Sequence, residues 1–267
     1  MKNILVLAHD DAGQESRIQT ALDLARALDG HVTFVDVAMM FPPLGEADAI
    51  GISAVAYGEE LTREKVNRER IEARLRNEDV RWEWIDASGD IATELRRIAP
   101  LADLIVVNRA IDDSASGGTL AIAGELIVKS DRPVLAVPAE TVGMNARGSA
   151  LILWDGSPAS EAALRAATPL LELARDVTLV EVDDGSIRTP AAQAATYLSR
   201  HGVHVTIERQ NPAGRKTGAV LLAKLLHDRP AYAVMGGYGH SRMIQALFGG
   251  VTRTLLNASP VPLFLAR

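Results

Sequence analysis

The chain alternates between short apolar runs and longer segments whose apolar residues recur every three or four positions. The first run, Asn3–Asp11, is apolar up to its last three residues. The segment that follows, Glu15–Leu28, places Ile18, Leu22 and Ala25 on one face of a helix. Continuous apolar runs of this length indicate buried strands, and the wider spacing indicates amphipathic helices. The opening therefore predicts a strand followed by a helix.

The same alternation continues through the first half of the chain. Further strands are predicted at His31–Met40, Val80–Ile85, Ala102–Asn108 and Arg132–Pro138. Helices are predicted between them at Leu61–Arg76 and Ile91–Ile98. Strands that are apolar throughout and separated by helices are typical of a parallel sheet covered on both faces. The one long connection, Ala38–Glu60, is expected to be a loop.

The series then begins again, which indicates an internal duplication. The segment Asp176–Val182, DVTLVEV, matches His31–Val37, HVTFVDV, almost residue for residue, and a repeat of this kind decides the architecture. The glycine-containing segment Ala139–Ser149 has the composition of a linker. We therefore assign an N-terminal domain to residues 1–140 and a C-terminal domain to residues 147–267.

A group of glycines follows the fourth predicted strand of the second copy. They are Gly236, Gly239, Gly249 and Gly250. Open α/β sheets bind ligands beyond the carboxyl ends of their strands, which is where these glycines fall. The amides that begin the last helix could bind phosphate oxygens with help from the helix dipole. These residues are Gly250, Val251 and Thr252. The alternative is that the glycines only form a tight connection between strand and helix.

Two copies of a unit of roughly 130 residues, the second ending in G-x2-G-x9-G, resemble the universal stress protein (UspA) family in its tandem form. The resemblance implies two Rossmann-like, adenine nucleotide alpha hydrolase-like α/β domains, each a five-stranded parallel-type sheet with helices on both faces. It also implies ATP, possibly with Mg, as the ligand. By position, Asp155 would lie near the ribose and adenine, and Val182 would contact the adenine. Gly250 stands where the family has a hydroxyl residue, and Thr252 could supply one.

Asp155 also has a purely structural interpretation, because Asp155 and Ser157 belong to a sequence typical of a turn and helix cap. The first copy departs further from the motif, since Gly117–Gly118 does not align with the second pair of glycines. Asp112 and Asp113, in the same predicted loop, would repel phosphate. We therefore expect nucleotide only in the second copy.

His9, Asp10 and Asp11 are adjacent at the end of the first strand and suggest a metal site. Neighbouring carboxylates in a loop are more often solvated, so no metal site is predicted.

Composition narrows the functional classes. The 267 residues are 48% hydrophobic with a formal net charge of −6 and no cysteine. This charge argues against a nucleic-acid partner, and the absence of cysteine removes thiol chemistry and fits a cytoplasmic protein. No membrane-spanning run is predicted. No familiar catalytic motif occurs, so no catalytic residue is assigned and an enzymatic activity is left uncertain.

The function implied by the resemblance is a nucleotide-binding regulator of a stress response, acting through the second copy. Two alternatives stay open: a slow ATPase, and an interaction module without nucleotide. The last strands of the copies, Pro133–Pro138 and Val261–Ala266, are strongly apolar and would invite association if left at a sheet edge. We expect them to lie opposite each other in an intrachain pseudo-dimer, with a homodimer as a further possibility. Independent domains on a flexible linker are the competing arrangement.

Overall fold

The computed structural model describes residues 1–39, 52–109, 111–113, 118–120, 122–238 and 250–267. The strands are β1 (Asn3–Leu7), β2 (His31–Met39), β3 (Arg81–Gly89), β4 (Leu104–Asn108), β5 (Ile111–Asp113), β6 (Gly118–Leu120), β7 (Val134–Val137), β8 (Ser149–Trp154), β9 (Asp176–Val182), β10 (Val205–Gln210), β11 (Tyr232–Gly236) and β12 (Leu263–Ala266). The helices are α1 (Gln14–Leu28), α2 (Ile52–Leu75), α3 (Ile91–Ile98), α4 (Ile122–Lys129), α5 (Pro158–Leu171), α6 (Ala191–Arg200), α7 (Thr217–Asp228) and α8 (Gly250–Ala258), with a short 3-10 turn, η2 (Ala99–Leu101), after α3.

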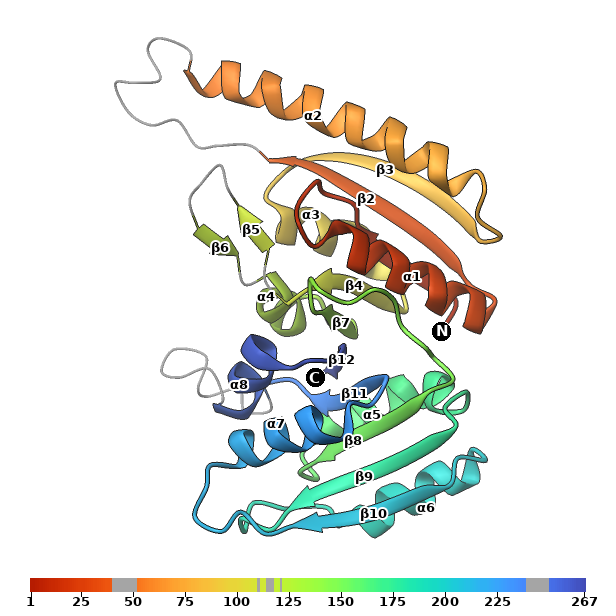
Figure 1. Ribbon diagram of the computed structural model, residues 1–267, viewed down its shortest axis with the longest axis vertical. Coiled ribbons are helices and arrows are strands. Elements are labelled where there is room, and N and C mark those ends of the chain that lie inside the picture. The colour runs from red at the N-terminus through yellow and green to blue at the C-terminus, as the bar shows by residue number, and fades with distance from the viewer. Residues whose placement is uncertain (40–51, 110, 114–117, 121, 239–249) are drawn as a thin grey trace.

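Ten of the described strands form one continuous sheet in the order β10-β9-β8-β11-β12-β7-β4-β1-β2-β3 (Figure 1). Neighbouring strands within each half run parallel. Each half contributes five strands, so the expected pair of five-stranded, parallel α/β domains is confirmed. The duplication is visible in the order of the strands, which is the same in both halves when counted outward from the middle of the sheet.

The two halves meet where the last strand of each pairs with the other. The strands expected opposite each other, β7 and β12, pair antiparallel, with Leu263 opposite Ala136 and Leu265 opposite Val134. All four residues are fully buried. The pairing satisfies backbone groups that would otherwise form an exposed, apolar sheet edge.

Helices cover both faces of the sheet. One apolar layer contains buried residues of α1, α2, α5 and α6, and the other contains residues of α3, α4, α7 and α8. Successive strand residues alternate between the layers: Ile4 and Val6 face the first, Leu5 and Leu7 the second. This period of two is the geometry of a strand. Because both layers include residues of β7 and β12, each continues from one half into the other.

The segment between the halves packs against the protein. Met144 and Ala146 are buried in the first apolar layer. The backbone N–H of Met144 donates a hydrogen bond to Asp23 Oδ2 in α1 at 3.0 Å. A segment that is buried and hydrogen-bonded in this way differs from the flexible linker that independent domains would have.

Two local expectations were wrong. Helix α2 begins at Ile52, so the last nine residues of the connection expected as a loop, 52–60, are helical. The reason is local composition, because Ala54, Ala56 and Glu59 favour helix and outweigh Gly58. The rest of that connection, residues 40–51, lies outside the described residues. In addition, β5 and β6 pair as a small antiparallel ribbon where a loop was expected.

Candidate functional site

Strand register shows which positions of the two halves correspond. Val32 pairs with Ile4 in the first half, and its repeat partner Val177 pairs with Ala150 in the second. Counting forward from these pairs, His9 and Asp155 hold equivalent positions just after the first strand of each half. By the same register, Asn108 at the end of β4 is equivalent to Gly236 at the end of β11.

The second-half edge is defined here as the carboxyl ends of β8, β9 and β11. Strand β8 lies between β9 and β11, so the chain leaves β8 to one side and returns on the other. Such a switch point is where open α/β sheets place ligands. Asp155 follows β8, Val182 ends β9 and Gly236 ends β11, so the structure brings these three predicted residues to one edge. Two predicted glycines, Gly239 and Gly249, lie outside the described residues.

The other predicted phosphate-binding residues begin α8. Gly250, Val251 and Thr252 occupy its first turn, where backbone amides have no partner within the helix. The Cα of Val251 would lie 3.3 Å from a Cβ added to Gly218, in the first turn of α7. The N-terminal turns of α7 and α8 therefore lie side by side, and their positive dipole ends are close together.

The glycines of this edge serve different purposes. A Cβ on Gly236 would lie 2.6 Å from the backbone nitrogen of Ser160, so glycine is needed where β11 approaches α5. A Cβ on Gly250 would meet no atom within 4 Å. Neither residue has a positive φ, so left-handed geometry explains neither glycine. Gly236 has a packing role whether or not a ligand binds, whereas Gly250 leaves open space.

Asp155 and Ser157 build the turn before α5, as the structural interpretation of the sequence predicts. Asp155 Oδ1 accepts a hydrogen bond from the Ser157 amide at 2.9 Å, and Ser157 Oγ accepts one from the Ser160 amide at 3.2 Å. Asp155 is nevertheless exposed. Val182 and Thr252 are buried, so their side chains mainly face protein. Of the described candidates, Asp155 and Gly250 are the ones exposed to solvent.

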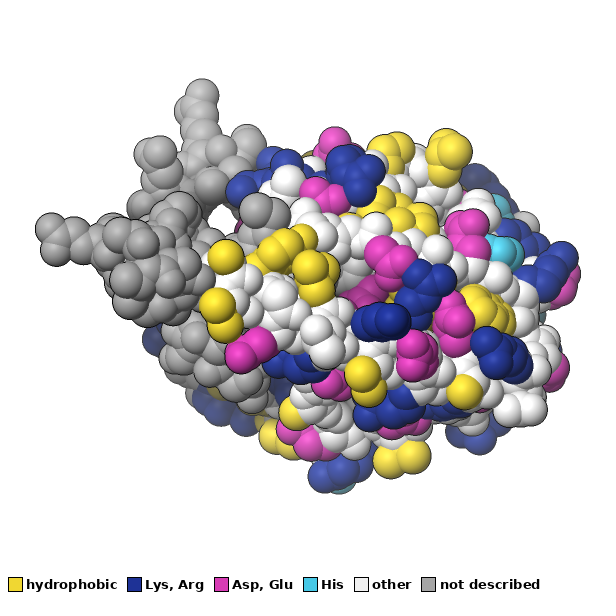
Figure 2. Space-filling model, turned by 90° about the horizontal axis from the view of Figure 1, so that it is seen from above, with side chains coloured by type: hydrophobic (Ala, Val, Ile, Leu, Met, Phe, Trp, Pro, Cys, Tyr) yellow, Lys and Arg dark blue, Asp and Glu magenta, His cyan; other side chains and the backbone are white. Residues whose placement is uncertain are grey.

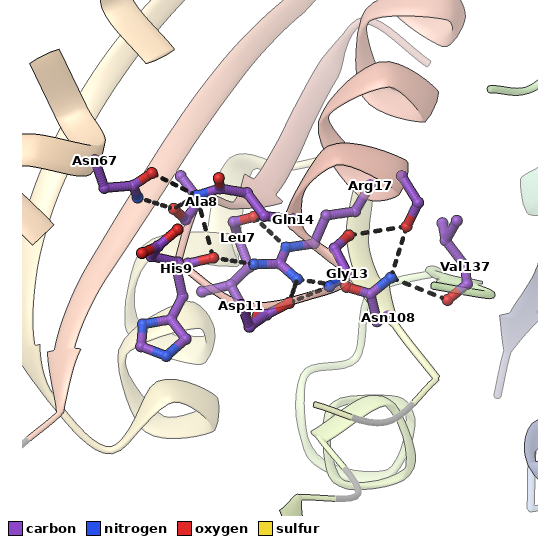
Figure 3. Close-up of polar contacts among 12 residues, drawn as sticks. Leu7, Ala8, His9, Asp11, Gly13, Gln14, Arg17, Asn67, Asn108 and Val137 are labelled. Carbon is purple, nitrogen blue, oxygen red and sulfur yellow. Dashed lines mark hydrogen bonds and ion pairs between the residues drawn. The ribbon is translucent and has the colours of Figure 1, made fainter. Parts of the chain in front are cut away.

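The equivalent edge of the first half is filled by a buried arginine. Arg17 of α1 has no exposed surface, and its guanidinium lies among four acceptors (Figure 3). It donates to the carbonyl of Leu7 at 2.6 Å and to Asp11 Oδ1 at 2.8 Å. It also donates to the carbonyl of His9 and to Asn108 Oδ1. The arginine is therefore fully engaged inside the protein.

Asn108 also occupies the first-half edge. Its Nδ2 donates to Ser16 Oγ at 2.9 Å and to the carbonyl of Val137 at 3.2 Å. Its Oδ1 lies where a Cβ on Gly13 would come within 2.4 Å. Thus the first half places an amide and a guanidinium where the second half has a glycine, and these side chains occupy the first-half edge.

A second polar group lies beside this network, and we call it the His9 cluster: His9, Asp36, Glu60 and Glu64. His9 follows β1, Asp36 lies in β2, and the two glutamates lie one turn apart on α2. His9 Nδ1 is 2.6 Å from Glu64 Oε1 and 4.0 Å from Glu60 Oε1. All four side chains are buried. Charged groups are rarely buried so completely without strong partners.

The surroundings shift two of these carboxyl groups in opposite directions. Burial, together with the charge and a hydrogen bond of Glu64, raises the pKa of Asp36 to about 9. Burial would also raise the pKa of Glu64, but the hydrogen bond and charge of His9 hold it below the usual value. In the metal-free protein at neutral pH, Asp36 therefore keeps a proton that it shares with Glu64, as closely spaced carboxylates do.

The structure regroups the residues that suggested a metal from the sequence. Asp10 Oδ1 accepts from Arg70 at 3.0 Å, and Asp11 binds Arg17, so neither joins His9. The partners of His9 come from β2 and α2 instead. One sequence signal could have found them: Asp36 interrupts an otherwise apolar strand, and Glu181 does so at the equivalent position of the second half.

The outer surface of the first half does not resemble a nucleic-acid interface. Seen from above, basic and acidic side chains are interspersed on this face, and the apolar ones form separate small groups (Figure 2). Among the described helices, none combines the length and the apolar content that a membrane crossing requires.

With this geometry in place, the fold can be compared with known structures. A universal stress protein from Archaeoglobus fulgidus DSM 4304 matches with a TM-score of 0.75 and 16% identity, covering 98% of each chain. A candidate universal stress protein from Pseudomonas aeruginosa UCBPP-PA14 matches with a TM-score of 0.58 and 15% identity, over 100% of this chain and 93% of that one. A functionally unknown protein from Pseudomonas aeruginosa PAO1 has the same TM-score and identity, over 100% and 92%.

These likenesses establish the architecture. The chain has the fold of a tandem universal stress protein, and the resemblance found in the sequence is confirmed at that level. No family sequence model and no curated protein sequence matches the chain. The identities of 15 to 16% carry the fold but not a ligand or a residue's role.

Proposed function

We propose that this chain is a tandem universal stress protein whose second half binds one adenine nucleotide at the second-half edge. The observation that carries the proposal is the difference between two equivalent edges of one sheet. In the first half, Arg17 and Asn108 fill the edge with side chains that bind one another. In the second half, the place of Asn108 is taken by Gly236, and the switch point between β8 and β11 carries an exposed aspartate, Asp155.

The described residues fit an adenine nucleotide. The exposed carboxylate of Asp155 is an acceptor suited to ribose hydroxyl groups, and only its Oδ1 is engaged by the turn. The first turn of α8, from Gly250 to Thr252, offers backbone amides and a positive dipole end for phosphate oxygens. Open space at Gly250 lets a phosphate approach the backbone closely.

The functional consequence is regulation rather than fast turnover. The edge offers acceptors and amides for binding, and no described residue there is placed as a base or nucleophile. A bound nucleotide then acts by favouring the conformation that binds it more tightly, and its effect is limited by the difference in affinity between two states. The proposed function is therefore that of a stress regulator controlled by a nucleotide.

The proposal is tested by stoichiometry and by two substitutions. Calorimetry of the full chain with ATP is expected to give one site per chain, and mass spectrometry of ligand released from freshly purified, denatured protein is expected to identify an adenine nucleotide. Gly250→Val should weaken binding at least tenfold, about 1.4 kcal/mol, because the side chain occupies the phosphate approach. Asp155→Asn should also weaken it. Neither variant should lose its fold, since a Cβ on Gly250 meets nothing and Asp155 is exposed.

A matched control is Gly58→Val, because a Cβ on Gly58 of α2 also meets no atom within 4 Å, but the residue lies in the first half. Its affinity for ATP should equal that of the unmodified protein. Two equivalent sites per chain, or unchanged affinity in both Gly250→Val and Asp155→Asn, would overturn the assignment. Phosphate release that survives Gly250→Val would identify a contaminating ATPase. If no nucleotide is released from the purified protein and added ATP does not bind, the interaction module is favoured.

A further inference from the structure

The His9 cluster contains buried polar atoms that lie near one another but make no hydrogen bond of good geometry. Within the described residues, these include His9 Nδ1, Asp36 Oδ1, Glu60 Oε1 and Glu64 Oε1. His9, Asp36 and Glu64 each offer one potential metal-ligating atom, and these three atoms lie within 4.8 Å of one another. Buried polar atoms are nearly always paired, and leaving them unpaired costs free energy. Three such residues lie together, with Glu60 Oε1 4.0 Å from His9 Nδ1, and they require an explanation.

The charged groups at this place are mainly acidic. Three carboxyl groups meet there, and the cation that binds one of them is Arg63, whose Nη2 lies 2.6 Å from Glu60 Oε2 and 3.9 Å from Glu64 Oε1. The next arginine along the helix, Arg68, binds Glu72 and Asp86, outside the cluster. Metal ligands bind in their deprotonated forms. A neutral imidazole and three carboxylates beside Arg63 would then carry two negative charges, which a divalent ion compensates.

We propose that the His9 cluster binds one divalent transition-metal cation, with His9 Nδ1, Asp36 and Glu64 as ligands and Glu60 as a fourth. A divalent ion compensates the deprotonated carboxylates and pairs the atoms that make no hydrogen bond of good geometry. The donor set, one imidazole with carboxylates, suits Mn²⁺, Fe²⁺ or Zn²⁺ better than Ca²⁺ or Mg²⁺, which prefer all-oxygen sites.

The geometry needs only a small adjustment. Metal bonds of about 2.0–2.2 Å place two ligand atoms roughly 3.3 Å apart at a tetrahedral centre and up to about 4.4 Å apart across an octahedral one. The 2.6 Å between His9 Nδ1 and Glu64 Oε1 is shorter than this, so these two atoms must separate by less than 1 Å when the ion enters. The proton shared by Asp36 and Glu64 leaves at the same time, as ligand binding to a metal requires.

The surroundings hold the ligands in place. Asn67 Nδ2 donates to Glu64 Oε2 at 3.2 Å and to the carbonyl of Ala8 at 2.8 Å, while its Oδ1 accepts from Gln14 Nε2 at 2.8 Å. Outer contacts of this kind orient metal ligands. An open groove of about 660 Å³ along α2 is lined by Arg63 and Asn67. Arg63, which borders the cluster, is partly exposed to solvent there.

The equivalent position in the second half shows that the fold does not require such a cluster. Glu181 replaces Asp36 in the register and is also buried. It is fully paired, because Oε1 accepts from the Ala191 amide at 2.6 Å and Oε2 from Arg209 Nε at 3.2 Å. A buried acidic residue at this place can therefore be neutralised within the protein, and in the first half it is not.

The test uses the full chain, stripped with a chelator and kept free of nucleotide. Calorimetry with MnCl₂ and ZnCl₂, together with elemental analysis after dialysis, is expected to give one ion per chain with micromolar or tighter affinity. Asp36→Asn and Glu64→Gln keep the side-chain shapes and should each weaken binding at least tenfold. Two controls should bind as the unmodified chain does: Glu59→Gln, an exposed residue of the same helix, and Glu181→Gln.

A spectroscopic readout makes the result independent of the stability of the variants. Electron spin echo modulation of bound Mn²⁺ should show an imidazole nitrogen, and His9→Gln should remove that signal although five other histidines remain. Circular dichroism confirms that each variant is folded. The proposal is overturned if stripped protein takes up no ion at 100 μM, if the nitrogen signal persists in His9→Gln, or if the two controls weaken binding as much as the ligand variants do. Failure here leaves the nucleotide proposal untouched, because its residues lie in the other half.

Discussion

Removing Arg17 tests whether the first-half edge is held by the buried network in Figure 3. In Arg17→Ala, four acceptors lose a donor together: the carbonyls of Leu7 and His9, the carboxylate of Asp11 and the amide oxygen of Asn108. The aspartate is then a buried charge without its partner. This is the situation in which a buried ion pair matters most, because the remaining charge has lost both water and its counterion.

The expected magnitude follows from the burial of the pair. Breaking a buried ion pair by removing one partner costs about 3–5 kcal/mol, which is a large share of the 5–15 kcal/mol that holds a typical domain folded. The side chain of Arg17 has no exposure and that of Asp11 has 5%, so the full range applies. With a urea dependence of about 2 kcal/mol per molar, the unfolding midpoint should fall by roughly 1.5–2.5 M.

The control is Arg26→Ala on the same helix. Arg26 also binds carboxylates, those of Glu78 and Asp79, but its side chain is 32% exposed. Exposed ion pairs contribute about 0–1 kcal/mol, so this variant should unfold close to the unmodified protein. Fluorescence reports the first half alone if both variants are made with Trp154→Phe, since the remaining tryptophans are Trp82 and Trp84.

The reasoning is refuted if Arg17→Ala and Arg26→Ala lower the free energy of unfolding by the same amount. If Arg17→Ala lowers the unfolding free energy by less than about 1 kcal/mol, the guanidinium is not the partner that satisfies these acceptors. The statement that the first-half edge is filled would then fail with it, and with it the contrast on which nucleotide binding by the second half alone is proposed.

Two further outcomes are expected, one in thermal unfolding and one in acid. Gly237→Ala should lower the free energy of unfolding by about 1–3 kcal/mol, because its Cβ would lie 2.4 Å from Ile127 Cγ2 of the other half. Gly250→Ala is the control and should leave stability unchanged, since its Cβ meets nothing. Equal melting temperatures for the two variants would contradict the packing of the halves. Burial would raise the pKa of Asp103, but hydrogen bonds from two backbone amides hold it below the usual value. A lowered folded pKa gives stability that is present above about pH 4 and is lost as the pH falls through the folded pKa. Asp103→Asn should therefore be less stable than the unmodified protein at pH 7, and this difference in stability should shrink in acid. A constant difference from pH 7 to pH 3 would contradict the prediction.

The fold could be predicted because its signals are local. Each buried strand is an apolar run, and the repeat of His31–Val37 in Asp176–Val182 reveals the duplication directly. The start of α2 at Ile52 could not be placed, because Gly58 and the preceding prolines obscure the residues that favour a helix there. Propensity is a weak prior at such boundaries.

The candidate sites were predictable only where chain order determines position. Asp155 and Gly236 end neighbouring parallel strands, so topology alone brings them to one edge. Arg17 is different: on a predicted helix an arginine is expected at the surface, and its burial depends on Asn108, 91 residues away. His9 was noticed with its sequence neighbours, but its actual partner, Glu64, comes from a helix whose packing the sequence does not show.

The contrast between Asp36 and Glu181 gives a physical reason why we propose different ligands for the two halves. Each acidic residue is buried in the second strand of its half, and the residue beside it on the neighbouring strand is Asp86 in the first half and Arg209 in the second. In the second half, Arg209 is of opposite charge and forms an ion pair with Glu181. In the first half a like charge stands in that place, so Asp36 turns toward Glu64 and shares a proton with it. A proton compensates one charge of the cluster, whereas a divalent ion compensates two and pairs the remaining atoms. The duplicated acidic position is therefore paired within the protein in the second half, where we propose binding at the edge, whereas in the first half it belongs to the cluster for which we propose a cation.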